Sequence, residues 1–194
     1  MMTLIIGLVM FFGVHLISTN RQLRDGLVAR FSEPGFKIGY SILSLIGFIV
    51  IILGYHKMQM FVGSKNPVLW YPPAWTKPVA FLAMIPAMIF LVAAYVPSRI
   101  RFFLRHPMLL AVKIWALAHL LANGTVAALV LFSSFLAFAV YDRISLKRRH
   151  VEARPEDAQA GVANDIIVVL LGLALYAVML KWGHGYLIGK PLLS

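Results

Sequence analysis

The chain contains no cysteine among its 194 residues, so it forms no disulfide, binds no metal through thiolate and has no cysteine nucleophile. Charged residues are also scarce, because they make up 13% of the chain against about 25% in a typical soluble protein. Acidic residues are the rarer kind, with seven Asp and Glu against 18 Lys and Arg. No carboxylate pair and no serine–histidine–acid arrangement points to a hydrolase.

The apolar fraction of the sequence is correspondingly high. Apolar residues form 61% of the chain against roughly 45–50% in soluble domains, which predicts an integral membrane protein folded as one compact bundle. In a soluble protein the net charge of +11 would suggest nucleic-acid binding. Here most Lys and Arg lie between apolar segments, where they set topology and contact anionic lipid head groups. Membrane lipids are therefore the expected partners, and nucleic acid is not.

Six apolar stretches predict an all-α fold, an integral membrane bundle of about six transmembrane helices, within a single domain over residues 1–194. The fourth stretch is short and contains Lys113, so a bundle of five helices is the alternative. Asn123-Gly124 predicts a tight turn after this stretch. Asn164 or Asp165 is expected to cap the sixth helix. The predicted spans are residues 2–18, 38–55, 79–96, 107–121, 125–141 and 166–182.

The basic residues of the connections are unevenly shared between the two sides of the membrane. Twelve Lys and Arg lie in the first, third and fifth connections, and four lie on the other side. By the positive-inside rule the larger set faces the cytoplasm, so both termini are expected on the outer side. The loop from Gly63 to Lys77, rich in Trp, Tyr and Pro, is typical of the outer interface. Pro155 is expected to open a short surface helix in the cytoplasmic loop.

Four of the six histidines lie at the ends of spans or outside them. His56 and His184 fall at the outer ends of the second and sixth spans, where an interfacial histidine needs no special role. His150 follows a basic run in the cytoplasmic loop and is expected to be solvated. His106 precedes a proline at the inner start of the fourth span, where a histidine usually has a structural role at the start of a helix.

His15 and His119 lie deep inside the first and fourth spans, where an ionisable residue costs free energy unless it has a partner. At about 1.5 Å of rise per residue, both lie roughly 10–15 Å from the inner edge of the hydrocarbon core. Neutral imidazole is a good iron ligand, so one interpretation is a pair of axial ligands to a haem. A hydrogen-bonded pair and a proton or ion pathway are the alternatives that the residues leave open. Neighbours at helical spacing are Phe11, Phe12, Ser18 and Thr19 for His15, and Trp115, Ala116, Ala122 and Asn123 for His119.

Two sequence blocks around these histidines carry a family resemblance. The first runs Phe11-Phe12-Gly13-Val14-His15 and is followed by Arg21 and Arg24. The second runs Arg105-His106-Pro107-Met108 and continues from Trp115 through His119 to Asn123-Gly124. Both blocks resemble NnrU-type membrane proteins, and the resemblance extends over nearly the whole chain, including the loop from Trp70 to Trp75.

The resemblance implies a bacterial protein linked to denitrification and the metabolism of nitric oxide or nitrite. Its membrane is then expected to be the inner membrane, so the outer side predicted above for both termini is the periplasm. The family is similar to the haem-dependent zeta-carotene isomerase, whose axial histidines belong to the motifs matched here by His15 and His119. It therefore implies a haem b held by these two residues. Trp115 and Asn123 are then expected beside the cofactor, and the residues expected near its propionates are Arg21, Arg24, Arg105 and His106.

Three roles follow as expectations from this resemblance. The first is a redox or gas-responsive haem protein, and the second is a cis–trans isomerase of a carotenoid-like lipophilic substrate. The third is an accessory or assembly subunit with a partner in a membrane complex. The isomerase carries a cysteine near its second ligand, proposed to exchange with it, whereas this chain has Ala116 in that neighbourhood and no cysteine anywhere.

Overall fold

The computed structural model describes residues 1–149 and 154–193. In this part of the chain five helices are long and apolar enough to cross a membrane, and a sixth apolar helix, α6 (Pro107–Ala122), is shorter. The predicted all-α membrane fold is therefore confirmed. The chain divides into two compact units, Met1–Pro67 and Val68–Ser194. The single domain over residues 1–194 stays a prediction, and His150 lies outside the described residues.

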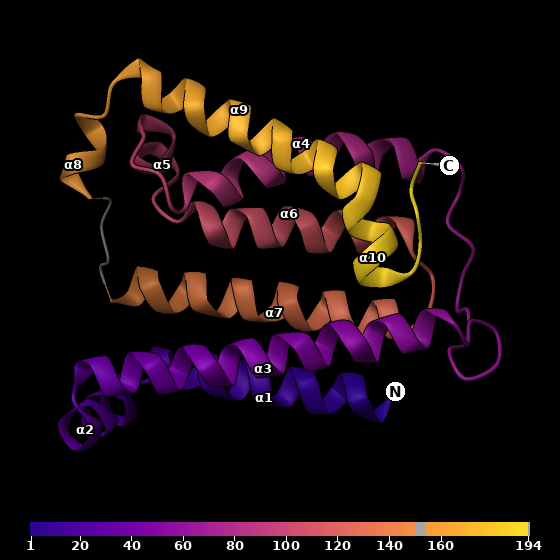
Figure 1. Ribbon diagram of the computed structural model, residues 1–194, viewed down its shortest axis with the longest axis horizontal. Helices are drawn as coiled ribbons and strands as arrows, with labels where there is room; N and C mark the ends of the chain where they lie inside the picture. Colours follow the sequence, from indigo (N-terminus) through magenta and orange to yellow (C-terminus); the bar gives the residue numbers. More distant parts are fainter. Residues whose placement is uncertain (150–153, 194) are drawn as a thin grey trace. The chain divides into compact units, whose positions relative to one another are not determined.

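The first unit is a hairpin of α1 (Met2–Thr19) and α3 (Glu33–Gln59), joined through the shorter helix α2 (Arg21–Phe31) (Figure 1). The Asn20 side chain caps α2 by accepting a hydrogen bond from the backbone N–H of Leu23. The sequence pattern predicted only a connection here, because α2 has no apolar run and no buried residue. The helix α3 begins before the predicted residues 38–55, where the Ser32 side chain caps it.

Close packing of α1 against α3 depends on three glycines. A Cβ atom added at Gly7 would lie 2.6 Å from the backbone nitrogen of Ile51. One added at Gly47 would lie 2.8 Å from the backbone nitrogen of Phe11, and Gly54, two turns further along α3, makes a similar close contact. Small residues of this kind let helix backbones approach each other in a membrane. The hairpin therefore fixes the register of Phe11 against α3.

The second unit packs α4 (Thr76–Ala93) against both α6 and α9 (Val162–Val178), and α6 packs in turn against α7 (Val126–Arg148) (Figure 1). Met84, Ala87 and Met88 of α4 form a buried core with Ala118 of α6. The helix α9 continues through a π-helical turn, η1 (Met179–Gly183), into α10 (His184–Ile188). The last apolar helical segment is thus longer than the predicted residues 166–182.

The start of α9 corrects the predicted helix cap. The helix begins at Val162, ahead of both Asn164 and Asp165, so neither residue caps it. Asp165 instead accepts a hydrogen bond from Arg99 Nε at 2.6 Å, and Asn164 Nδ2 donates to the carbonyl of Pro97 at 2.9 Å. A charge-assisted bond to a guanidinium is stronger than a neutral cap, which explains why the carboxylate is used here.

The turn between α6 and α7 confirms the prediction from Asn123-Gly124. The Gly124 carbonyl accepts a hydrogen bond from the backbone N–H of Leu69 at 2.7 Å, so the loop before α4 lies against this turn. A side chain at Gly124 would collide with the backbone of Trp70, which accounts for the glycine. Thr125 then caps α7 by accepting a hydrogen bond from the backbone N–H of Ala128.

We expect Gly7→Ala to lower the thermal unfolding temperature of the purified protein, because the new methyl group would overlap the backbone of α3. Overpacking of this kind costs about 1–3 kcal/mol. The matched control is Gly13→Ala in the same helix, where no atom lies within 4 Å of the added carbon. Circular dichroism in detergent measures both changes. Equal stability of the two variants would contradict the packing described here.

Candidate functional site

The ring of His15 is held by the backbone of its own helix, α1. Its Nδ1 lies 2.7 Å from the carbonyl oxygen of Phe11, and because a carbonyl only accepts, Nδ1 carries the proton. The ring centroid lies 4.1 Å from that of Phe11 and 5.3 Å from that of Tyr40 on α3. Ser18 Oγ donates a hydrogen bond to the His15 carbonyl at 2.7 Å. The imidazole therefore has a fixed tautomer in an aromatic setting.

A shallow cavity opens beside the two aromatic rings that contact His15. Its volume is about 310 Å³, and it lies between α1 and α3 within the first unit. The lining is mostly apolar and aromatic, with three hydroxyl groups. Such a surface suits a flat, largely apolar group. The residues that line it are Phe11, Tyr40, Ser41, Ser44, Leu45 and Phe48.

His119 repeats the arrangement of His15 in the second unit. Its Nδ1 donates to the Trp115 carbonyl four residues earlier, at 2.8 Å. Asn123 Nδ2 donates to the His119 carbonyl at 2.9 Å. The ring stacks on Phe132 of α7, with centroids 4.6 Å apart, and lies 5.3 Å from the Trp115 ring. The structure therefore places Trp115 and Asn123 beside His119, as their spacing predicts.

A third histidine, His184, lies beside His119, although its sequence position predicted no special role for it. The two ring centroids are 6.0 Å apart and the ring planes differ by 4°. His184 is the first residue of α10, directly after the π-helical turn η1, and its Nδ1 lies 3.3 Å from the carbonyl of Met179. Its position at the outer end of a span gave no functional signal. The glycines Gly183 and Gly185 on either side of it are the one local hint of irregular backbone.

The hydrogen bonds at Nδ1 decide which ring nitrogen can bind a metal. A metal-ligating histidine usually donates its other N–H to a carbonyl or carboxylate, which fixes the tautomer and raises the basicity of the ligand atom. His15 and His119 both follow this pattern, so Nε2 is the ring nitrogen that would be left to bind a metal in each. The described residues contain no group of three or more His, Cys, Asp and Glu side chains that could hold a metal ion. An imidazole nitrogen is the kind of axial donor that a haem, which supplies its own equatorial nitrogens, takes from a protein.

The arginines of the first block lie on α2, beyond the end of α1. Arg24 pairs with Asp25 at 3.3 Å and with Glu33 at 3.7 Å, and its guanidinium lies 5.8 Å from the centre of the Phe36 ring. Arg21 is exposed. The predicted contact of Arg21 and Arg24 with haem propionates stays a prediction.

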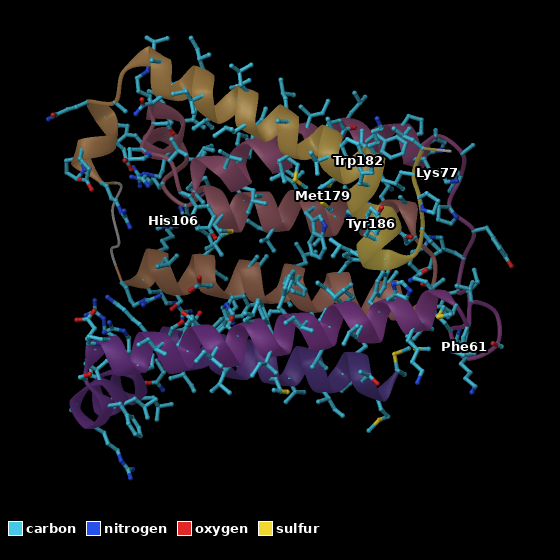
Figure 2. The ribbon with its side chains drawn as sticks, viewed as in Figure 1. Phe61, Lys77, His106, Met179, Trp182 and Tyr186 are labelled. Carbon is cyan, nitrogen blue, oxygen red and sulfur yellow. The ribbon has the colours of Figure 1, made fainter. Side chains whose placement is uncertain are left out.

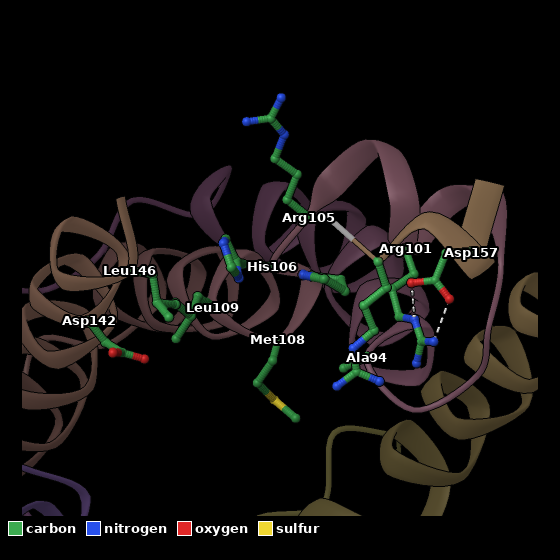
Figure 3. A pocket seen from close by; sticks show the side chains of 11 residues that line it. Ala94, Arg101, Arg105, His106, Met108, Leu109, Asp142, Leu146 and Asp157 are labelled. Atoms are coloured by element: carbon green, nitrogen blue, oxygen red, sulfur yellow. Dashed lines mark hydrogen bonds and ion pairs between the residues drawn. The ribbon is translucent and has the colours of Figure 1, made fainter. Parts of the chain in front are cut away.

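Arg105 and His106 lie at the start of α6, roughly 20 Å along the helix from His119 by helical rise. They line a cavity of about 280 Å³ at this end of the second unit, together with Arg101, Arg154, Asp142 and Asp157 among others. Figure 3 shows the Arg105 side chain pointing away from the Arg101–Asp157 pair. The predicted contact of Arg105 and His106 with the propionates stays a prediction.

An ion pair joins the two short helices beside this cavity, α5 (Arg99–Leu104) and α8 (Pro155–Ala158). Arg101 Nε donates to Asp157 Oδ2 at 2.7 Å, and Arg101 Nη2 donates to the other carboxylate oxygen (Figure 3). The Asp157 side chain is 2% exposed and that of Arg101 is 11% exposed. The hydrogen bonds to Asp157 raise the pKa of the Arg101 guanidinium further above its usual value. The short helix predicted at Pro155 is confirmed, and this pair fixes it.

Comparison with known proteins yields one family match. The family model described as NnrU protein matches residues 3–192, which include both histidine blocks. No curated protein and no solved structure matches the chain. The roles proposed below for individual residues are therefore argued from the observed geometry and the family match.

We expect Asp157→Ala to destabilise the protein by about 3 kcal/mol, because it leaves the Arg101 guanidinium buried without its carboxylate. The neighbouring Glu156→Ala is the matched control, since Glu156 is exposed. Thermal unfolding in detergent compares the two variants with the unmodified protein. A loss of stability for Glu156→Ala as large as that for Asp157→Ala would contradict the role given to the pair.

Proposed function

The chain belongs to the NnrU family, and on this premise we propose that it is an integral membrane protein that binds haem b through His15 and His119. One observation carries this proposal. The histidine of each family block donates its Nδ1 proton to the carbonyl four residues earlier, which leaves Nε2 as the ligand atom. The two histidines share this restraint and lie in the two blocks that define the resemblance, which favours a shared role.

The surroundings of each histidine support this assignment. Phe11 and Tyr40 lie beside His15, and Trp115 and Phe132 lie beside His119, so each proposed ligand has aromatic rings next to it within its own unit. Such rings keep water from the imidazoles and match the apolar edge of a macrocycle.

We propose a redox or gas-responsive role for this haem, in the nitric oxide or nitrite metabolism with which the family is associated. A haem iron held by two imidazoles can change its oxidation state, and it binds a diatomic gas when one axial ligand leaves. No thiolate can take part in such an exchange, because the chain has no cysteine.

The proposed location is the bacterial inner membrane, with both termini on the periplasmic side. The uneven share of Lys and Arg supports this orientation, because twelve of them lie in the first, third and fifth connections and four lie on the other side. Ion pairs on the cytoplasmic side, such as Arg99 with Asp165 at 2.6 Å, do not offset the excess of Lys and Arg on that side.

The purified, haem-supplied protein should show a low-spin haem b in its reduced-minus-oxidised and pyridine haemochrome spectra. His119→Ala should abolish this spectrum, because Nε2 of that residue is then missing. His15→Ala should lose the native axial pair and lower the haem content. His56→Ala is the matched control, since His56 lies near the outer end of α3 and should leave the spectrum unchanged. A well-folded preparation without haem, or a His15→Ala variant with the native spectrum, would contradict the proposal.

The cysteine-free sequence makes the orientation directly testable. Ser64→Cys, in the loop before α4, should react with a membrane-impermeant maleimide in intact cells, because this loop is proposed to be periplasmic. Gln159→Cys, just after α8, should react only after the membrane is opened. Both positions are exposed, so equal reactivity of the unfolded variants provides the reference. The reverse pattern of labelling would contradict the orientation.

A further inference from the structure

The cavity of about 280 Å³ at the start of α6 is lined by charged as well as apolar side chains (Figure 3). It lies within the second unit, beside the end of α7 and the short helices α5 and α8. Figure 2 shows His106 at this end of the unit and Lys77, near the start of α4, at the opposite end. The end that holds His106 is the one proposed to face the cytoplasm. The cavity therefore lies at the level of the lipid head groups of that leaflet.

Both carboxylates in the lining of this cavity are neutralised by arginines. Asp157 accepts hydrogen bonds from Nε and Nη2 of Arg101. Asp142 lies 3.6 Å from the guanidinium of Arg149, at the end of α7. Neither acid therefore adds an uncompensated negative charge to the cavity. A guanidinium has five N–H groups and Asp157 uses two of those of Arg101, so three remain as donors.

Two further arginines line the cavity and have no carboxylate partner among the described residues. Arg105 lies in the turn before α6, Arg154 lies directly before α8, and both residues are exposed. Their positive charges are therefore available to an anion. A guanidinium is well suited to phosphate, because its planar fork forms two parallel hydrogen bonds to phosphate oxygens.

The backbone of Arg105 is strained. Its φ is 60° and its ψ is −48°, a conformation that residues with a side chain rarely adopt. Such strain costs free energy and is concentrated at sites where a ligand is held. Glycine adopts a positive φ without this cost. A ligand contact made by the Arg105 side chain would offset the strain.

The remaining lining of the cavity is largely apolar. It comes from Ala94 at the end of α4, from residues 107–109 of α6 and from Leu146 of α7. A ligand with an anionic end and a lipophilic end matches a lining of both kinds. Pockets for whole small molecules usually have volumes of about 300–1,000 Å³, so this cavity suits a head group rather than a complete lipid. Basic pockets between transmembrane helices on the cytoplasmic side are suited to anionic head groups.

We propose that this cavity binds the phosphate group of an anionic phospholipid from the cytoplasmic leaflet. Arg105 and Arg154 bind the phosphate oxygens, Arg101 contributes its remaining N–H groups, and the apolar residues contact the start of the acyl chains. A free phosphate ion shares the anionic chemistry but lacks the lipophilic part. The inference does not depend on the haem, because the cavity lies roughly 20 Å along α6 from His119. It assigns Arg105 to a lipid, whereas the family resemblance implies a haem propionate.

The test follows thermal unfolding of the purified protein in detergent during titration with phosphatidylglycerol. The lipid should raise the unfolding temperature, because it binds the folded state. Native mass spectrometry should detect the retained lipid. Arg105→Gln/Arg154→Gln should weaken this binding roughly 30-fold, since each basic residue near an anionic lipid contributes about a fivefold factor. The matched control, Lys147→Gln/Arg148→Gln, removes two exposed charges from the end of α7 outside the cavity and should bind as the unmodified protein does.

Arg105→Gly provides a second variant that relieves the backbone strain. Without lipid it should unfold at the same temperature as the unmodified protein or higher, but phosphatidylglycerol should stabilise it less. Inorganic phosphate and zwitterionic phosphatidylcholine should each give a much smaller shift than phosphatidylglycerol. Three results would overturn the proposal: undiminished lipid binding by Arg105→Gln/Arg154→Gln, an equal loss of binding in the matched control, or a shift with inorganic phosphate or phosphatidylcholine as large as that with phosphatidylglycerol.

Discussion

A polar group inside the hydrocarbon of a membrane must find its partner within the protein, because lipid offers none. His15 and His119 meet this demand through one repeated interaction, the hydrogen bond from Nδ1 to the carbonyl four residues earlier. The bond uses the helical rise itself, so it needs no second helix to hold the ring. It also fixes the tautomer and leaves Nε2 as the atom that can bind iron. The proposed chemistry of the protein follows from this one local constraint.

Close packing of the neighbouring helices determines which side chains surround the two histidine rings. In the first unit Gly7 and Gly47 bring the backbones of α1 and α3 together, and the ring of Tyr40 on α3 lies 5.3 Å from that of His15. In the second unit Phe132 of α7 stacks on His119, and the π-helical turn after α9 brings in His184. Small residues and one irregular turn thus determine which rings surround each imidazole.

Sequence predicted the apolar spans well, because hydropathy over a helix length is a strong signal. It missed α2, whose polar surface pattern resembles an ordinary loop, and it misplaced the cap of α9, where Asp165 pairs with Arg99 instead. The neighbours of His119 followed from helical spacing, since Trp115 and Asn123 lie one turn away on the same helix. His184 could not be found in this way. It is 65 residues from His119 in the chain, and a π-helical turn that sequence spacing does not encode brings the two rings together.

The account depends on histidine nitrogen as the ligand of a haem iron, and one measurement tests this most directly. The ferric protein, prepared with ¹⁵N-labelled histidine, can be examined by pulsed electron paramagnetic resonance for hyperfine coupling to nitrogen. The account predicts two strongly coupled histidine nitrogens on a low-spin iron. A haem with no coupled histidine nitrogen, or a chain that binds no haem at all, would contradict it.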